Sequence, residues 1–148
     1  MSRSLVLLSV MACATPAWAA TACPQHFAVG VAPLLTNAQL QPRTRELCFE
    51  AYAVLHSGVS RTPVYAAEHL TRANLLEART LSRQDAFHTE ASLPAADRSE
   101  LGDYARSGYD RGHMAPNGDM PTRTAQAQSF SLANMVPQVH ANNAGVWA

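Results

Sequence analysis

Lysine is absent from this 148-residue sequence, and all eleven of its basic side chains are arginines. Eleven acidic side chains balance them, and charged residues make up only 15% of the chain. No basic tail or acidic tract therefore indicates a partner. With 47% hydrophobic residues, the chain is too apolar for a disordered or collagen-like protein. Internal repeats are also missing, and the length allows one domain with one core.

The sequence has no apolar run long enough to cross a bilayer, which requires about 20 residues. The run over residues 5–12 has the length of a signal-peptide core, and Ala17 and Ala19 place small residues where signal peptidase cleaves. We therefore predict a signal peptide over residues 1–19 and a domain over residues 20–148. We expect the mature protein in the periplasm or the medium, without a membrane anchor.

Cysteine is scarce, and removal of the predicted signal peptide would leave only Cys23 and Cys48. An even number of cysteines in an exported protein favours a disulfide. The alternative is two buried free thiols. Two cysteines without paired histidines at metal-ligand spacing disfavour a structural zinc site.

Hydrophobic alternation predicts strands in the first half of the mature chain. Residues 46–57 alternate with a period of two, which predicts one strand. A turn signal at residues 57–58 precedes a second predicted strand over residues 62–70, so the two should pair antiparallel. Residues 23–45 are rich in proline, asparagine and glutamine, and we expect irregular structure there.

The second half mixes helices, loops and strands. Pro94 is expected to open a short helix, and residues 124–128 to form a helical turn. Residues 129–135 alternate again, which predicts a strand ended by Pro137. Residues 142–143 are both asparagine, a favoured N-cap residue, and should begin a helix. This order of elements predicts an α+β fold.

The segment from Asp110 to His113 combines groups suited to phosphodiester chemistry. The His113 imidazole can take a proton from water near neutral pH, and the Arg111 guanidinium matches the geometry of a phosphate. On a strand both side chains point to one face. Gly112 between them would let a ligand approach the backbone.

Two downstream asparagines, Asn134 and Asn143, offer neutral oxygen ligands of the kind that Mg²⁺ accepts. Base, cation and oxygen ligand are the parts that metal-assisted phosphodiester hydrolysis requires. Each residue also has a plainer alternative: a structural role for His113, an ion pair of Arg111 with Asp110 or Asp103, an N-cap role for Asn143, and a buried amide bonded to backbone for Asn134.

Four segments together resemble the DNA/RNA non-specific endonuclease family, which has the ββα-metal (His-Me finger) fold: residues 110–116, 119–120, 129–138 and 142–147. Upstream, residues 61–65 and 67–71 are similar to the first strands of that family. The resemblance covers the chain from about Cys23 to its last residue.

The resemblance implies a role for each candidate residue. His113 would be the general base that activates a water, and Arg111 would hold the phosphate. Asn143 would be the one direct protein ligand of Mg²⁺, with Mn²⁺ as a substitute, and Asn134 would orient His113 or the water shell of the metal. The implied substrates are DNA and RNA, cut with little sequence preference because the backbone is read rather than base edges.

Members of the family continue beyond the motif at which this sequence ends, with an acidic residue on the next helical turns. We therefore expect an N-terminal portion of the domain, incomplete at its C-terminal end, with apolar side chains such as Phe130 and Leu132 left exposed. An alternative of another class is a non-catalytic, exported nucleic-acid-binding or interaction domain on the same scaffold.

Overall fold

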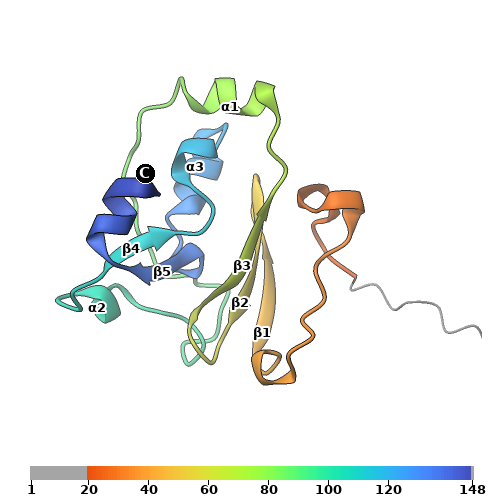
Figure 1. Ribbon diagram of the computed structural model, residues 1–148, viewed down its shortest axis with the longest axis vertical. Coiled ribbons are helices and arrows are strands. Elements are labelled where there is room, and N and C mark those ends of the chain that lie inside the picture. The colour runs from red at the N-terminus through yellow and green to blue at the C-terminus, as the bar shows by residue number, and fades with distance from the viewer. Residues whose placement is uncertain (1–19, 148) are drawn as a thin grey trace, which may run out of the picture.

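The computed structural model describes residues 20–147, so the predicted signal peptide lies outside the described residues (Figure 1). Within the described range, no helix is long and apolar enough to cross a membrane. The chain forms a three-stranded sheet with an irregular N-terminal segment on one side and a layer of short helices and strands on the other. The α+β class expected from the sequence is confirmed.

The first sheet is antiparallel with the strand order β1 (Thr44–Cys48), β2 (Tyr52–Ser57), β3 (Thr62–Glu68). The predicted pairing across the turn at residues 57–58 is confirmed as the β2–β3 pair. The single strand predicted over residues 46–57 is wrong, because a tight turn divides it into β1 and β2. The Phe49 N–H donates to the Tyr52 carbonyl at 2.9 Å, and the two rings stack with centroids 4.5 Å apart.

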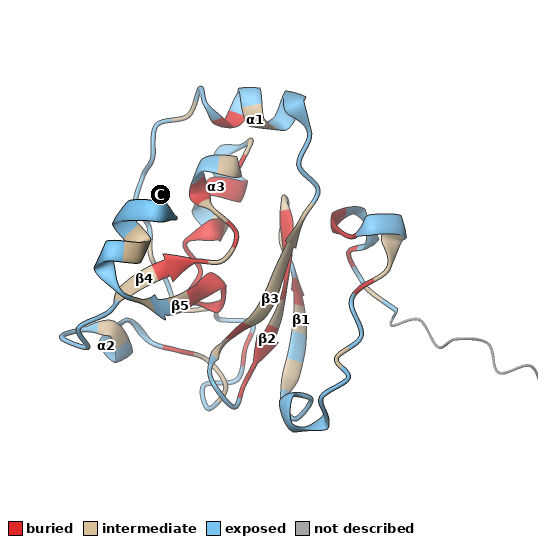
Figure 2. Cartoon of the chain, in the orientation of Figure 1, coloured by how far each residue is buried: buried red, intermediate tan, exposed pale blue. Residues whose placement is uncertain are grey.

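Strand β2 is buried on both faces (Figure 2). Tyr52 and Val54 pack into the core between the sheet and the helical layer. Ala53 points the other way and packs against Cys23 and Phe27 of the N-terminal segment. The period of two thus divides the strand between two small cores.

Three short α-helices belong to the second layer: α1 (Arg72–Ala78), α2 (Leu101–Tyr104) and α3 (Arg123–Ser129). The predicted helical turn over residues 124–128 is confirmed as part of α3. The helix predicted to open at Pro94 is wrong: Pro94 accepts a bond from Asp97 N–H at 2.9 Å and forms an isolated turn. Helix α2 begins at Leu101, where Glu100 and Asp103 form a reciprocal capping box.

A second antiparallel pair, β4 (Asp110–His113) and β5 (Met135–Gln138), places His113 opposite Met135. The strand predicted over residues 129–135 is wrong, because those residues end α3 and form a 3₁₀ turn, Leu132–Asn134. Pro137 lies within β5 rather than after it. Proline is tolerated because β5 pairs on one side only.

The side chains of Phe130 and Leu132, which we expected to be exposed, are completely buried. They lie in the turn that connects α3 with β5, which faces the sheet and not the solvent. The expectation of exposed apolar strand faces is therefore wrong for both residues. The large apolar side chains left exposed after β5 are instead Val139, Val146 and Trp147.

After β5 the chain becomes helical at residue 140 and continues into a π-type turn, Asn142–Val146. The prediction that the helix begins at residues 142–143 is therefore wrong, because it begins two residues earlier. The Trp147 indole N–H donates to the His113 carbonyl at 3.1 Å. This bond fastens the helical turn across β4, and the two strands with the turn form a ββα unit (Figure 1).

The N-terminal segment is irregular up to β1, as predicted, apart from three short 3₁₀ turns. The structure joins Cys23 to Cys48 in a disulfide with Cα atoms 5.7 Å apart, which confirms the predicted pairing. Beside it, the Glu46 carboxylate accepts bonds from the Thr21 hydroxyl at 2.7 Å and the Ala22 N–H at 2.9 Å. The segment is thus bound to β1 at several adjacent points.

Reducing the disulfide should lower the free energy of unfolding by about 3 kcal/mol, because the bond closes a loop with a sequence separation of 25. Guanidinium titrations with and without reductant measure the difference. A Cys23→Ala/Cys48→Ala variant is the control, since reductant should leave its midpoint unchanged. Equal midpoints of the oxidised and reduced native protein would contradict the prediction.

Candidate active site

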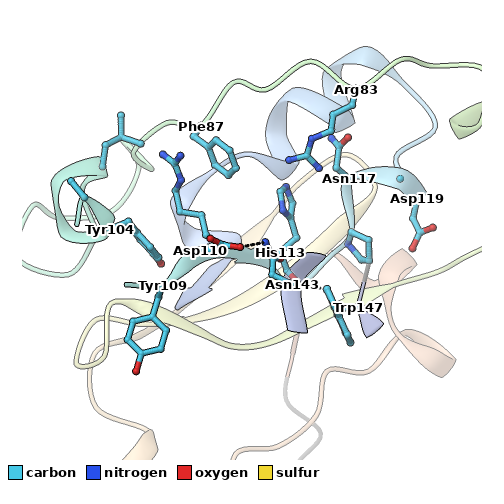
Figure 3. A pocket seen from close by; sticks show the side chains of 15 residues that line it. Arg83, Phe87, Tyr104, Tyr109, Asp110, His113, Asn117, Asp119, Asn143 and Trp147 are labelled. Atoms are coloured by element: carbon cyan, nitrogen blue, oxygen red, sulfur yellow. Dashed lines mark hydrogen bonds between the residues drawn. The ribbon is translucent and has the colours of Figure 1, made fainter. Parts of the chain in front are cut away.

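A cavity of about 1010 Å³ opens beside β4. Its walls come from the segment after α1, from α2, from the 3₁₀ turn Asn117–Asp119 and from the C-terminal helical turn. Figure 3 shows His113 near the middle of this cavity, with Tyr104 and Tyr109 to one side and Asp119 to the other. Two predicted site residues besides His113 line it, Arg111 and Asn143.

His113 lies in the wall of the cavity with only 8% of its surface exposed. The rings of Phe87 and Phe130 lie against the imidazole at centroid distances of 5.8 and 5.2 Å. Burial lowers the pKa of His113 to about 4, and the charge of Arg83 adds to this effect against a smaller opposing one from Asp85. The imidazole is therefore neutral at pH 7, the form that can accept a proton.

Arg111 reaches the same cavity as His113, as expected for alternate residues of one strand. Its guanidinium lies 4.1 Å above the centroid of the Phe87 ring. Arg111 forms no ion pair with Asp110 or Asp103, the alternative suggested by the sequence: the Asp103 carboxylate pairs with Arg61, and Asp110 Oδ2 lies 2.8 Å from His140 Nδ1. A guanidinium that rests on an aromatic face keeps the N–H donors at its own edge available for an anion.

Gly112 does not serve the ligand approach that we expected. A Cβ atom at this position would lie 2.8 Å from the Cβ of Gln138, the neighbouring side chain on β5. The position alternates with Arg111 and His113 and so faces away from the cavity. The absence of a side chain here allows the two strands to pack.

Arg83 is a second cation at the cavity, and the sequence did not point to it. Its guanidinium lies 5.0 Å above the Phe130 ring, and its Nε donates to Asp85 at 2.6 Å. The residue lies in an irregular segment between α1 and Phe87. Without periodicity in that segment, nothing but the tertiary structure brings Arg83 beside His113.

The Asn143 side chain lines the cavity from the helical turn and is held by Asp110. Its Nδ2 donates to Asp110 Oδ2 at 3.1 Å (Figure 3), and His140 Nδ1 lies 2.8 Å from the same oxygen. These two contacts, that of Asn143 first, lower the pKa of Asp110. Asn143 lies inside the helical turn, so the N-cap alternative is wrong.

The donor set at Asn143 fits a hard cation that keeps its water. Because the amide nitrogen is bound by Asp110, the carbonyl oxygen is the atom left for a ligand. In residues 20–147, the only cluster of three His, Cys, Asp or Glu ligand groups is Cys23, Glu46 and Cys48, far from this cavity in the sequence and containing the disulfide. A cation beside Asn143 would therefore have water for most of its ligands, as Mg²⁺ commonly does.

Asn134 does not reach the cavity. The side chain is fully buried, with Oδ1 accepting the Ala115 N–H at 2.9 Å. Its Nδ2 donates to the carbonyls of Ala115 and Ser129 at 2.9 and 3.0 Å. We expected Asn134 to orient His113 or a metal-bound water, but its polar atoms are used by the backbone, which corresponds to the alternative role.

Comparison with known proteins agrees with this geometry. The family model "DNA/RNA non-specific endonuclease" matches residues 31–148. The chain is 43% identical to "Nuclease EXOG, mitochondrial" of Danio rerio over 59% of this chain and 25% of that protein. It is 40% identical to "Nuclease C1" of Cunninghamella echinulata var. echinulata over 61% and 36%. The chain thus matches about a quarter to a third of the length of these curated relatives.

A solved structure is also similar. The crystal structure described as the EndoG/EndoGI complex, on the mechanism of EndoG inhibition, superposes with a TM-score of 0.59 and 32% sequence identity. The superposition covers 69% of this chain and 43% of that chain. This similarity supports the ββα-metal fold for the strand pair and helical turn that surround His113.

Replacing Asn134 by alanine should destabilise the fold, because three buried backbone groups lose their partner. Each unsatisfied group costs about 1–3 kcal/mol, so we expect the free energy of unfolding to fall by at least about 3 kcal/mol in chemical denaturation. Asn37→Ala is the matched control: it removes an exposed side-chain cap with one bond to Gln39 N–H at 3.0 Å, typically worth ~1 kcal/mol. Normal stability of Asn134→Ala together with lost activity would instead place this residue in the catalytic machinery.

Proposed function

The chain belongs to the DNA/RNA non-specific endonuclease family, and from that premise we propose that it carries the hydrolytic site of an exported, Mg²⁺-dependent nuclease. Its substrates are DNA and RNA, and it hydrolyses their phosphodiester bonds. The observation that carries the proposal is His113, a neutral imidazole in the wall of a cavity that two guanidinium groups, Arg83 and Arg111, also line. A neutral base can take the proton of an attacking water, and cations in the same cavity can stabilise the charge that develops on a phosphodiester.

In this mechanism His113 takes a proton from a water molecule. The water oxygen forms a bond to phosphorus, and the bond from phosphorus to the departing sugar oxygen breaks in line with it. Burial assists the step because it keeps the imidazole unprotonated before the reaction. The leaving sugar oxygen takes up a proton from solvent, and His113 later returns its proton to water.

Arg111 and Arg83 bind the anionic oxygens of the phosphate and stabilise the charge that grows on them. Both side chains rest on aromatic rings, Arg111 on Phe87 and Arg83 on Phe130. The rings of Phe87 and Phe130 contact each other edge to face at 4.9 Å. Cations held in place before the substrate arrives need little reorganisation during the reaction.

Asn143 would hold the divalent cation through its side-chain oxygen. A bound Mg²⁺ supplies positive charge for the phosphate and the departing oxygen. Asp110 is a positioning residue here: it binds the Asn143 amide nitrogen and so turns the oxygen toward a ligand. The contact of His140 with the same carboxylate restricts Asp110 in turn.

His113→Ala should lower the rate of plasmid and RNA hydrolysis in Mg²⁺ at least 10²–10⁴-fold, the usual contribution of a general base. EDTA should stop the unmutated protein. The assay compares both proteins at equal concentration, with folding checked by circular dichroism. Full activity of His113→Ala would falsify the assigned base. Nucleic-acid binding without any hydrolysis by the unmutated protein would favour the alternative of a non-catalytic binding domain.

Asn143→Ala should weaken the binding of Mn²⁺ measured by calorimetry and raise the Mg²⁺ concentration needed for half-maximal activity. Asp110→Asn should act in the same direction but less, because the oxygen ligand remains and only its orientation is loosened. His113→Ala is the matched control, with slow hydrolysis and nearly normal Mn²⁺ binding. Identical Mn²⁺ affinities of the unmutated protein and Asn143→Ala would exclude Asn143 as a ligand.

The activity should change little with pH between 6 and 8. An imidazole with an ordinary pKa near 6.5 would lose its proton in this range, and the rate would rise with pH. Because the pKa of His113 is lowered to about 4, the base form already dominates at pH 6 and is lost only on approach to pH 4. Rates at saturating Mg²⁺ across pH 4–8 test this. A midpoint near pH 6.5 would show that the imidazole is solvated in the working enzyme.

A further inference from the structure

One end of the cavity differs in chemistry from the end that holds His113. The end that holds His113 carries the charged side chains of the lining, Arg83, Arg111, Asp110 and Asp119, whereas the end next to α2 is lined by Leu101, Tyr104, Ala105 and Tyr109. We call these four residues the aromatic wing. With a volume of about 1010 Å³, the cavity has room for more than the phosphate group that reacts.

Two side chains of the aromatic wing leave much apolar surface in water. Leu101 is 44% exposed and Tyr109 is 51% exposed. Tyr104 is more buried, and its hydroxyl donates to the Met135 carbonyl at 3.3 Å. Tyr104 and Tyr109 also line a neighbouring hollow of about 210 Å³, so the wing forms a ridge between two recesses.

The loop that carries Tyr109 is held by its own hydrogen bonds. The Ser107 hydroxyl donates to the Tyr104 carbonyl at 2.9 Å and accepts the Tyr109 N–H at 3.1 Å. Gly108 has a φ of +83°, a conformation that glycine adopts without strain and that completes this turn. Upstream, the capping box fixes the start of α2. An apolar surface held in this way loses little conformational freedom when it binds a ligand.

The wing adjoins the cation that we assign to the phosphate. Tyr109 comes two residues before Arg111, and both line the same cavity. A polynucleotide strand has a base beside every phosphate, and every base has an apolar face that stacks on aromatic side chains. Asp103, beside Tyr104 and Tyr109 in the neighbouring hollow, is paired with Arg61 at 3.4 Å, so its charge is balanced.

We propose that the aromatic wing is a nucleobase subsite, in which Tyr109 and Leu101 bind a base of the strand whose phosphate Arg111 holds. The inference rests on the proposed function, because it assumes that a polynucleotide enters the cavity. A base can stack on Tyr109 only when it has left its neighbours in a helix. The subsite therefore favours unpaired segments of DNA or RNA over duplexes, without preference for one base.

Binding of labelled oligonucleotides, followed by fluorescence anisotropy in EDTA to prevent cleavage, tests the subsite. The probes are a single-stranded DNA, an RNA of the same sequence, an abasic DNA strand of equal length and charge, and a DNA duplex. The unmutated protein should bind the DNA and RNA strands several-fold more tightly than the abasic strand. Tyr109→Ala should lose roughly 5- to 100-fold in affinity for both base-containing strands, as removal of a stacking side chain does. It should bind the abasic strand and the duplex normally.

Two further variants separate stacking from a general loss of structure. Tyr109→Phe keeps the ring and should bind as the unmutated protein does. Leu76→Ala removes a comparably exposed apolar side chain on α1, outside the cavity, and should also bind normally. Thermal unfolding should show Tyr109→Ala to be folded, because the Ser107 bonds are made by the backbone of residue 109.

Equal affinity of the unmutated protein for intact and abasic strands would overturn the subsite and leave the proposed nuclease standing. Equal losses of Tyr109→Ala on intact and abasic strands would overturn it too. Loss of binding in Tyr109→Phe would mean that the hydroxyl, not the ring, is recognised. If the unmutated protein bound none of the four probes, the result would contradict the proposed function itself, and the subsite with it.

Discussion

The pairing of β4 with β5 sets where every group of the site lies. The pairing orients Arg111 and His113 toward one face. Polar groups at the two ends of β4 then hold the turn before β5 and the C-terminal helical turn in place. The Asn134 side chain binds the Ala115 backbone just beyond the end of β4. The Trp147 indole binds the His113 carbonyl and so attaches the helical turn to β4. Asp110, at the first position of β4, then holds Asn143. The four residues of β4 therefore position a base, a cation and an amide oxygen that are up to 32 positions apart in the sequence.

Two aromatic rings of the site both shield His113 from water and support the two arginine side chains. Phe87 and Phe130 exclude water from His113, and the same rings support Arg111 and Arg83. Removal of water weakens the hold of His113 on a proton, and nearby positive charge weakens it further. Both effects act in one direction, so the residue remains a proton acceptor well below neutral pH. The low local dielectric also strengthens the attraction between the guanidinium groups and an anion.

The sequence predicted the parts of the fold whose signals are local. The β2–β3 pair, the shared face of Arg111 and His113 and the helical turn in α3 follow from periodicity and turn chemistry. The break between β1 and β2 was missed because the alternation continues through the turn. Pro137 predicts the end of a strand, but a strand with one unpaired edge accepts a proline within it.

Asn134 and Asn143 look alike in the sequence. Only the burial of each side chain in the folded chain distinguishes Asn134, which binds backbone, from Asn143, which lines the cavity. Arg83 and Phe87 lie in a segment without a pattern.

Tryptophan occurs at only two positions of the chain, 18 and 147. Residues 20–148 therefore contain a single indole, and this indole makes the bond that joins the helical turn to β4. Its emission depends on that one contact and on the half of its surface that meets water. This part of the chain thus contains its own spectroscopic probe at the junction between the proposed base and the proposed metal ligand. Docking and release of the helical turn are open to direct observation in the unlabelled protein.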